Sequence, residues 1–245
     1  MFFLIKNKKT LKDLIPENYT DIHSHLLPGI DDGAKSISDT LFLLNSMKKM
    51  GFGQFTATPH VITNIWDNTR EIIESTKNQV LQDFEERNLS VDLHAAAEYM
   101  MDDSFVKLFK SQKLLTLKDN YVLVEMSYIN APIQLYDIIF ELQVAGYIPI
   151  LAHPERYVFY HNNFSEYEKL KKAGCLFQLN LLSTVGYYGK KETETAQKLL
   201  EKGLIDFTGS DIHHEKHIKS FGNKILIKNS EPFKEALKNN EFFER

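Results

Sequence analysis

The sequence predicts an α/β domain in which buried parallel strands alternate with amphipathic helices. Seven short apolar segments recur along the 245 residues, and helical patterns separate them. Several of these segments are nearly continuous apolar runs, which is typical of strands buried on both faces of a parallel sheet. Successive strand–helix–strand units imply right-handed crossovers. Seven such units can close into a barrel or form an open doubly wound sheet, and periodicity alone favours neither.

The predicted elements follow one another at a regular rhythm. We expect strands at residues 20–26, 54–58, 91–97, 121–125, 148–152, 176–179 and 205–209. Between and after them we expect helices at residues 37–50, 68–87, 105–110, 133–145, 165–173, 192–202 and 232–238. No linker rich in proline, serine or glycine divides the chain. We therefore expect one domain over residues 19–245, preceded by an N-terminal arm of residues 1–18.

Local patterns support the first two helices. Ser36 and Asp39 have the spacing of a capping box, in which each side chain satisfies a free backbone N–H group of the other residue. In the second helix, the spacing of apolar residues predicts a core face made of Ile72, Val80 and Phe84.

Composition and charge exclude several classes of protein. Hydrophobic residues make up 43% of the chain and charged residues 25%, as in ordinary globular proteins. The net charge of −4 gives no basic surface for nucleic acid. Cys175 is the single cysteine, so no intrachain disulfide can form and nothing indicates an oxidising compartment.

The N-terminal arm has a short apolar run at residues 2–5. This run is too short for a membrane span, and lysines follow it, whereas they precede the apolar region of a signal peptide. We interpret the arm as a peripheral extension rather than as a membrane or partner contact. We expect a cytoplasmic protein without stable membrane insertion and without a nucleic-acid partner.

Side chains that can bind metal follow six of the seven predicted strands. They are His23, His25, His60, Glu98, Glu125, His153, Asp211 and His213. The carboxyl ends of parallel strands share one edge, where barrel enzymes have their active sites. Residues two apart on a strand point the same way and lie roughly 6.5 Å apart, so His-x-His and Asp-x-His can bind one ion from two points. Imidazole with carboxylate favours Zn, Fe or Mn over Ca, and eight ligands suit two or three ions.

Each of these residues also has a structural interpretation. A lone histidine near a strand end usually makes structural hydrogen bonds, and Glu125 alone could be an exposed or ion-paired residue. Five of the nine histidines gather with carboxylates at one edge, however, and this concentration favours a metal site. We interpret His94 as structural. His161, His214 and His217 lie in predicted loops, and the last two are near enough to the site to contact substrate.

Asp31 and Asp32 lie in the loop after the first strand. Asp-Gly sequences favour tight turns, which would explain this pair without any ligand role. Alternatively, one of the two carboxylates reaches back over the site as a further ligand, and we favour Asp32 for this.

These residues lie in segments that resemble the polymerase-and-histidinol-phosphatase (PHP) superfamily, most of all the bacterial PHP-type protein tyrosine phosphatases of capsule and exopolysaccharide loci. The segments are DIHSHLLPGIDDGAKS, TATPHV, AAAEY, VLVEMS, GYIPILAHPERY and GSDIH. The first and fifth are specific, and the six segments together span residues 21–213. The resemblance implies a distorted seven-stranded (β/α)7 barrel with a trinuclear site, often loaded with Mn²⁺. Its ligands would be His23, His25, Asp32, His60, Glu98, Glu125, His153, Asp211 and His213.

The resemblance also concerns phosphate binding. Arg156 in HPER matches an arginine that holds the phosphate in this family. Relatives often have another arginine several residues after the Asp-x-His pair, where this chain has HEKHIKS. Lys216, His217 or Lys219 replaces it here, or no residue does. The second-strand histidine is followed by VITNIW, where some relatives have basic residues. Both differences concern substrate range more than the metal site.

The implied activity is hydrolysis of phosphotyrosine, for example on the tail of a bacterial tyrosine kinase. In this hypothesis the metals and Arg156 bind the non-bridging phosphate oxygens. Asp32 or His213 would supply a proton to the leaving group. Four tyrosines either stack on the tyrosyl ring or simply pack in loops. They are Tyr128, Tyr157, Tyr187 and Tyr188.

Several alternatives remain open. The chain could be a histidinol-phosphate or other small-molecule phosphatase, or a non-catalytic metal-binding partner of a kinase; it could also form an oligomer. A cysteine-dependent phosphatase requires Cys-x5-Arg, but Leu181 stands at that distance from Cys175, which we interpret as a buried structural thiol. An amidohydrolase-type barrel also begins with His-x-His, but it ends on a lone aspartate and uses a carboxylated lysine. The Asp-x-His pair and Glu125 favour a phosphoesterase.

Overall fold

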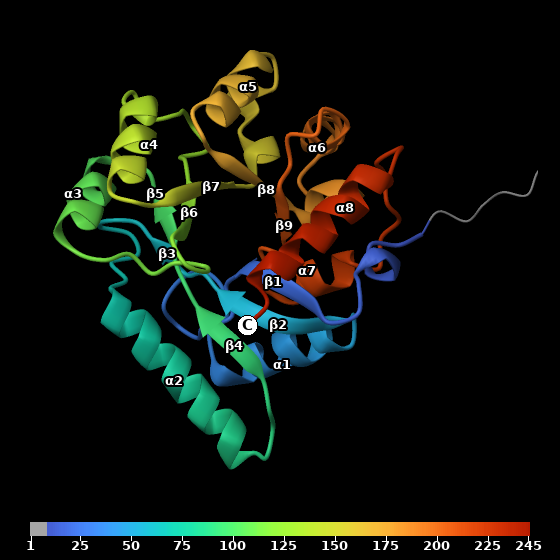
Figure 1. Cartoon of the computed structure of the whole chain (residues 1–245). Coiled ribbons are helices and arrows are strands. Elements are labelled where there is room, and N and C mark those ends of the chain that lie inside the picture. Colours follow the sequence, from blue (N-terminus) through green and yellow to red (C-terminus); the bar gives the residue numbers. More distant parts are fainter. Residues whose placement is uncertain (1–8) are drawn as a thin grey trace, which may run out of the picture.

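The computed structural model describes residues 9–245 and consists of two parallel sheets surrounded by helices (Figure 1). One sheet has the strand order β1-β2-β4 and the other the order β3-β5-β6-β7-β8-β9. All paired strands in both sheets are parallel. The predicted α/β class is therefore confirmed. The apolar run at residues 2–5 lies outside the described residues.

Residues 9–245 form nine strands, two more than the sequence predicts. They are β1 (Tyr19–Ser24), β2 (Phe52–Ala57), β3 (His60–Val61), β4 (Asp92–Ala95), β5 (Glu98–Met100), β6 (Tyr121–Glu125), β7 (Ile148–Ala152), β8 (Leu176–Asn180) and β9 (Phe207–Gly209). The unpredicted strands, β3 and β5, are short and begin soon after β2 and β4 end. Pro59 lacks a backbone N–H and lies between β2 and β3, where it interrupts the ladder.

Eight α-helices cover the outside of the sheets in the described part of the chain (Figure 1). They are α1 (Ile37–Lys48), α2 (Arg70–Glu86), α3 (Asp103–Ser111), α4 (Leu135–Val144), α5 (Ser165–Lys172), α6 (Lys190–Glu201), α7 (Glu215–Ser220) and α8 (Glu231–Asn239). Only α7 was not predicted, because its six residues include a single aliphatic one, Ile218. Between residues 9 and 245, every helix is too short or too polar to cross a membrane.

The ends and buried faces of these helices largely follow the sequence pattern. The capping box of α1 is confirmed, since the Ser36 side chain accepts from the Asp39 N–H and the Asp39 carboxylate accepts from the Ser36 N–H. In α2 the prediction for Ile72 is wrong. Ile72 is 42% exposed, and Ile73 instead lies in the core with Val80 and Phe84. A helix turns by about 100° per residue, so a shift of one position moves a side chain off the buried face.

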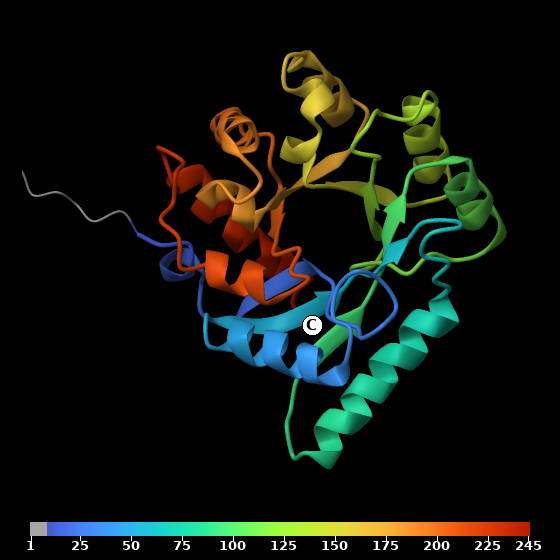
Figure 2. The same ribbon diagram turned by 180° about the vertical axis from the view of Figure 1, so that it is seen from behind.

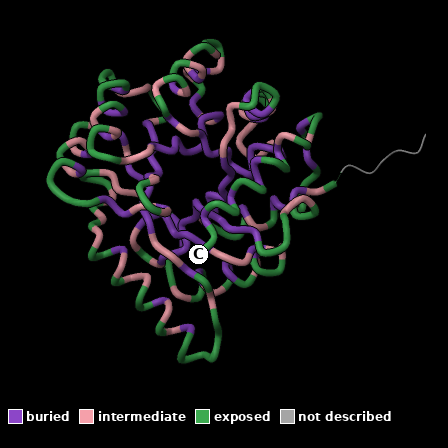
Figure 3. Tube along the Cα trace, viewed as in Figure 1, coloured by how far each residue is buried: buried purple, intermediate pink, exposed green. Residues whose placement is uncertain are grey.

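Most strand residues are buried, whereas the helices keep exposed outer faces (Figure 3). Part of the predicted N-terminal arm also contributes to the core. Leu11 is fully buried, and its N–H donates to the Asn223 carbonyl at 3.0 Å. Thr10 forms an antiparallel bridge with Lys224. The arm from residue 9 onward therefore packs against the segment that follows α7.

The segment after β9 joins the end of β1. The His25 N–H donates to the Ile212 carbonyl at 2.9 Å, and the Asp211 N–H donates to the His23 carbonyl at 2.7 Å. Beneath these contacts, the buried Asp21 carboxylate accepts from the Ser210 N–H at 2.9 Å. These hydrogen bonds place the His-x-His and Asp-x-His segments directly beside each other.

Asn240, in the last helical turn, connects β1 and β9 on the side away from the His-x-His and Asp-x-His segments. Its side chain is fully buried and accepts from the Thr208 N–H at 3.0 Å. The amide nitrogen lies 2.8 Å from the carbonyls of Thr20 and Thr208 and 3.0 Å from the Tyr19 hydroxyl. One side chain therefore satisfies polar groups from both strands.

We expect Asn240→Ala to lower the free energy of unfolding by about 1–3 kcal/mol, because the buried partners of the amide lose their hydrogen bonds. Urea denaturation followed by circular dichroism measures this change. Asn239→Ala is the matched control, since its side chain makes an exposed hydrogen bond to the Asp206 carbonyl. An equal or larger loss for the control would contradict the assigned role.

Candidate metal centre

The centre of the site is formed by His23 of β1 and by His25, which directly follows the strand. His23 and His25 are fully buried, and their Nε2 atoms lie 3.3 Å apart. They point the same way because alternate residues of a strand share one face. The Nδ1 atom of His23 lies 2.7 Å from the Gln178 side-chain oxygen, and that of His25 lies 2.7 Å from Asp31. Both rings are therefore oriented with Nε2 toward the centre of the site.

The structure brings all nine predicted ligands together at one edge of the sheets. Their donor atoms form four groups, each with its atoms within 4.8 Å of one another. The groups are His25, Asp32, His60 and His213; His23, Glu98 and His153; His23, His25 and Asp211; and His60, Glu98 and Glu125. Because the groups share members, they form one continuous cluster.

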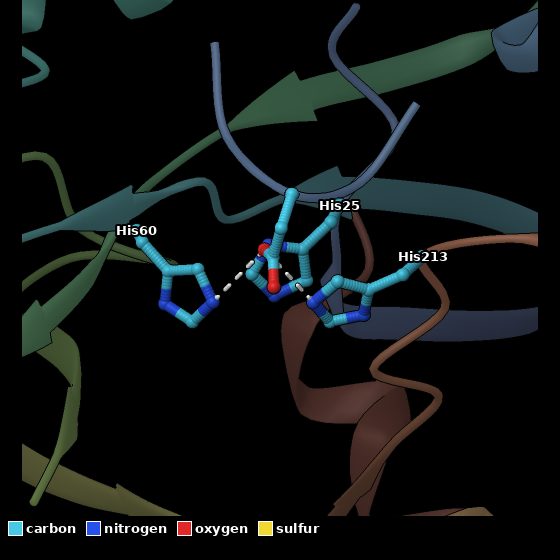
Figure 4. A group of neighbouring side chains, drawn as sticks. His25, His60 and His213 are labelled. Atoms are coloured by element: carbon cyan, nitrogen blue, oxygen red, sulfur yellow. Dashed lines mark ion pairs between the residues drawn. The ribbon is translucent and has the colours of Figure 1, made fainter. Parts of the chain in front are cut away.

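The two aspartates of the loop after β1 have different positions. Asp32 Oδ1 lies 3.4 Å from Nε2 of His60 and 3.4 Å from Nε2 of His213 (Figure 4). Its side chain is 55% exposed, so it covers the cluster from the solvent side. Asp31 is buried behind His25 and also accepts from the Gly33 N–H at 2.8 Å. Asp32 is thus placed to bind a metal, and Asp31 orients a ring.

Burial and neighbouring charges oppose each other at the carboxylates. Burial raises the pKa of Glu98, but the charges of His23 and His60 outweigh it and hold this pKa well below the usual range. Burial and the nearby Glu98 charge raise the pKa of Glu125 to about 7. Among the described residues, Glu98 Oε2 and His153 Nδ1 are buried and make no hydrogen bond of acceptable geometry, although Glu98 Oε2 lies 3.2 Å from His23 Nε2 and 3.1 Å from His60 Nδ1. Orphaned donor atoms in such a cluster fit the requirements of bound cations.

Two of the predicted ligands have an unusual backbone conformation. His153 has a φ of 37° and Asp211 a φ of 49°, both in the left-handed region. Non-glycine residues adopt this region at a cost of about 1–3 kcal/mol, and they do so mainly at functional sites. Each residue lies just after the end of its strand, and the turn directs its side chain into the cluster.

Arg156 lies beside the cluster in a fixed position. Its Nη1 donates to Asp211 Oδ2 at 2.9 Å. The guanidinium lies between two aromatic rings, 4.7 Å from the centre of Tyr128 and 4.0 Å from that of Tyr188. The preceding residue, Glu155, is buried and accepts from the Asn180 N–H at 3.1 Å, which anchors the turn to the end of β8. The arginine is therefore held before any substrate binds.

A cavity of ≈ 240 Å³ opens above the cluster. Tyr128, Arg156 and Tyr188 form part of its wall, together with Asp32 and three histidines of the cluster, His60, His153 and His213. Of the four candidate tyrosines, Tyr157 is fully buried, and its hydroxyl accepts from the Met126 N–H, so its role is packing. Tyr187 packs against Tyr188 and His217.

The residues after the Asp-x-His pair differ in their relation to the cavity. His214 and His217 line it, and His217 is buried. Lys216 is exposed and does not line the cavity, and Lys219 pairs with Glu215 at 2.8 Å. Of Lys216, His217 and Lys219, His217 is thus the one that lines the cavity.

Other histidines and the cysteine lie outside the cluster. His94 pairs with Asp92 at 2.7 Å, and the His161 ring lies 2.7 Å from the Glu155 carbonyl. Cys175 is fully buried just before β8, at the end of the sheet opposite the ligands. Burial raises the pKa of its thiol to about 12. Sequence analysis missed Asp31 and Gln178 as orienting residues; the available signal was a polar residue within the apolar strand LFQLN.

This chain has a buried cluster of imidazoles and carboxylates at the carboxyl ends of its parallel strands. It is therefore an α/β protein with a candidate metal centre. Residues 19–221 match a family model described as "Capsular polysaccharide synthesis, CpsB/CapC". This match spans most of the chain. The protein therefore belongs to the CpsB/CapC family.

Named relatives agree with this assignment. The chain is 28% identical to the tyrosine-protein phosphatase YwqE of Bacillus subtilis over 197 residues, which cover 80% of this chain and 78% of YwqE. It is 29% identical to the tyrosine-protein phosphatase CpsB of Streptococcus pneumoniae over 201 residues, which cover 79% and 82%.

Solved structures agree as well. One from a study of YwqE and CpsB, described there as "unique metal-dependent tyrosine phosphatases", matches with a TM-score of 0.77 and 26% identity over 92% of this chain and 88% of its own. An amidohydrolase from Mycoplasma synoviae matches with a TM-score of 0.55 and 12% identity over 96% and 91%, and this match shows the fold alone.

We expect the thiol of Cys175 to resist alkylation by iodoacetamide in the native protein and to react after unfolding in urea, because it is buried and has a raised pKa. Mass spectrometry of the labelled protein measures this difference.

We further expect Cys175→Ala to retain kcat/KM for aryl phosphates within about twofold, whereas removal of a catalytic nucleophile would abolish turnover. Loss of turnover in a folded Cys175→Ala protein would point to cysteine chemistry.

Proposed function

We propose that this protein is a metal-dependent protein tyrosine phosphatase. The observation that carries the proposal is the placement of a fixed arginine next to a cluster of nine candidate ligands, beneath one small cavity that Arg156 lines. The names of its relatives YwqE and CpsB support the same activity. Cleavage of a phosphate monoester requires a cation-rich site at the phosphorus, and this arrangement provides one.

The donor set fits two or three divalent cations. We infer that the ligands are the nine residues His23, His25, Asp32, His60, Glu98, Glu125, His153, Asp211 and His213. Five imidazoles with four carboxylates favour Mn²⁺, Fe or Zn²⁺, and we propose Mn²⁺ from the resemblance noted above. Such ions supply Lewis-acid stabilisation of phosphate charge and activate water for hydrolysis. Asp31 and Gln178 hold the β1 rings in the orientation that this binding requires.

We assign Arg156 to the phosphate. Its planar guanidinium matches the geometry of phosphate oxygens, and its ion pair with Asp211 fixes the direction in which it points. His217 lines the same cavity and is our candidate for a second phosphate contact. His213 and Asp32 lie at the solvent side of the cluster, where either can pass a proton to the departing tyrosyl oxygen.

We infer a wider context from the family. The family model concerns capsular polysaccharide synthesis, and we propose that the substrate is a phosphotyrosine protein of that process, such as a bacterial tyrosine kinase, in the cytoplasm. A tyrosyl leaving group has a pKa near 10 and needs little acid assistance. The weak need for acid assistance agrees with our assignment of the proton transfer to Asp32 or His213, at the solvent side of the cluster.

We also infer that the two sheets form one distorted seven-stranded barrel. The start of β3 soon after β2, and of β5 soon after β4, supports counting each pair as one interrupted strand. The hydrogen bonds between the end of β1 and residues 211–212 support closure between the first and last strands. We infer a single domain over residues 19–245.

We expect phosphate release from phosphotyrosyl peptides to be lost after EDTA treatment and restored by Mn²⁺, because the cluster cannot bind phosphate without cations. Phosphoseryl peptides and histidinol phosphate, assayed in parallel with metal content, test selectivity. Faster turnover of histidinol phosphate than of phosphotyrosyl peptides would identify the protein as a small-molecule phosphatase. No turnover by a metal-loaded protein would leave a non-catalytic binding role.

We expect Arg156→Ala to lower kcat/KM for aryl phosphates by about 10²-fold, since it removes a donor to the transition state. Metal content, measured by mass spectrometry, separates this loss from loss of the ions next to Asp211. Arg87→Ala is the control, because Arg87 directly follows α2 and is half-exposed, and its ion pair within residues 9–245 is with Asp83. An unaltered kcat/KM in Arg156→Ala would remove this arginine from the mechanism.

A further inference from the structure

The cavity above the cluster is too small for a folded protein segment. Its volume of ≈ 240 Å³ lies below the roughly 300–1,000 Å³ of typical ligand sites. It can take a phosphorylated side chain, while the peptide that carries this side chain must lie outside it. The surface next to the cavity therefore decides which phosphotyrosines gain additional contacts.

A second hollow of ≈ 440 Å³ adjoins the cavity on the side of α1 and α7. We call it the α1–α7 groove and define it by Lys35, Asp39, Phe42, Leu43 and Glu215. The two helices lie side by side at this edge of the molecule (Figure 2).

The α1–α7 groove adjoins the cavity. Asp32, His213 and His214 line both hollows and so form the boundary between them. A peptide that places its phosphotyrosine in the cavity can therefore reach the groove by passing over these three side chains.

The lining of the α1–α7 groove favours an apolar side chain. Phe42 is 44% exposed, whereas the neighbouring Leu43 is buried in the core. Phe42 thus presents ring surface at the groove, and covering apolar surface stabilises a complex by about 25 cal/mol per Å². Three carboxylates line the groove, those of Asp32, Asp39 and Glu215, against one lining ammonium, Lys35. Even with Glu215 paired to Lys219, carboxylates are in excess, so an acidic peptide residue is disfavoured there.

We propose that the α1–α7 groove binds the peptide segment next to the phosphotyrosine and selects an apolar residue there, through contact with Phe42. This inference rests on the proposed phosphatase function. It makes Phe42 a specificity residue outside the metal centre and Arg156, and it predicts that phosphotyrosines with an apolar neighbour are preferred over those with an acidic neighbour.

A second exposed apolar surface is the alternative place for contact with the peptide. Ile133, Phe140 and Val144 are 102%, 64% and 72% exposed on or just before α4. None of these three residues lines the cavity or the groove. Phe140 is therefore a matched control for Phe42, since both are exposed phenylalanines on helix surfaces.

The test compares phosphotyrosyl peptides that carry leucine, serine or aspartate near the phosphotyrosine on either side with p-nitrophenyl phosphate, which is confined to the cavity. The measured quantity is the ratio of kcat/KM for a peptide to kcat/KM for p-nitrophenyl phosphate. For the native protein we expect the leucine peptide to have the highest ratio and the aspartate peptide the lowest.

In Phe42→Ala we expect the ratio for the leucine peptide to fall by about fivefold, through a rise in KM. Losing part of an aromatic contact weakens the affinity for the peptide by about five- to tenfold. Phe42→Leu should restore most of the ratio, and Phe140→Ala should retain the native ratio. Thermal denaturation checks that each variant is folded.

The outcomes separate this proposal from the proposed function. Hydrolysis of p-nitrophenyl phosphate with equal ratios for all peptides, or with ratios that respond to Phe140→Ala and not to Phe42→Ala, overturns the groove assignment and leaves the phosphatase intact. No hydrolysis of any phosphate ester by the Mn²⁺-loaded native protein overturns the phosphatase function, and the groove assignment with it.

Discussion

The crowding of buried imidazoles and carboxylates at the strand ends is the constraint on which the rest of the structure depends. Glu98 Oε2 lies 3.2 Å from His23 Nε2 and 3.1 Å from His60 Nδ1, and all of these side chains are buried or nearly so. Burying charges without partners costs several kcal/mol per ion. The ring orientations and the opposed pKa shifts of Glu98 and Glu125 are consequences of packing donor atoms this closely.

The hydrogen bonds that join the end of β1 to the segment after β9 hold this crowding in place. The Asp211 N–H bonds to the His23 carbonyl, and Ser210 bonds to the buried Asp21 carboxylate. Asp211 is thereby kept in a left-handed conformation that a free loop would rarely adopt. Backbone hydrogen bonds formed in the sheet thus offset local strain at a residue whose carboxylate faces both the histidines and Arg156.

The sequence predicted most strand ends and eight of the nine clustered residues from short periodic patterns, whereas Asp32 lies in a loop and was favoured on its position and on the family resemblance. Apolar runs mark buried strands, and polar residues directly after them must share one edge. It did not predict β3, β5 or α7, since elements of two to six residues have too few positions to show a period. Gln178 was missed because its contact with His23 joins segments 155 residues apart. Asp31 was missed although its partner His25 is only 6 residues away, because no periodic pattern shows how an irregular loop turns a carboxylate. The core position was assigned to Ile72 instead of its neighbour Ile73. The spacing of apolar residues in this 17-residue helix does not distinguish two adjacent isoleucines.

The position of Arg156 limits how the site can recognise a tyrosyl ring. Tyr128 and Tyr188 each present a face to its guanidinium, so the arginine lies where a stacked substrate ring would otherwise be. These two aromatic residues therefore hold the cation in place more than they form a slot for the substrate. If the walls of the cavity do not provide selectivity by stacking, it must come from the reactivity of the tyrosyl leaving group and from contacts beyond the cavity. The surface that shares Asp32, His213 and His214 with the cavity is the place for such contacts.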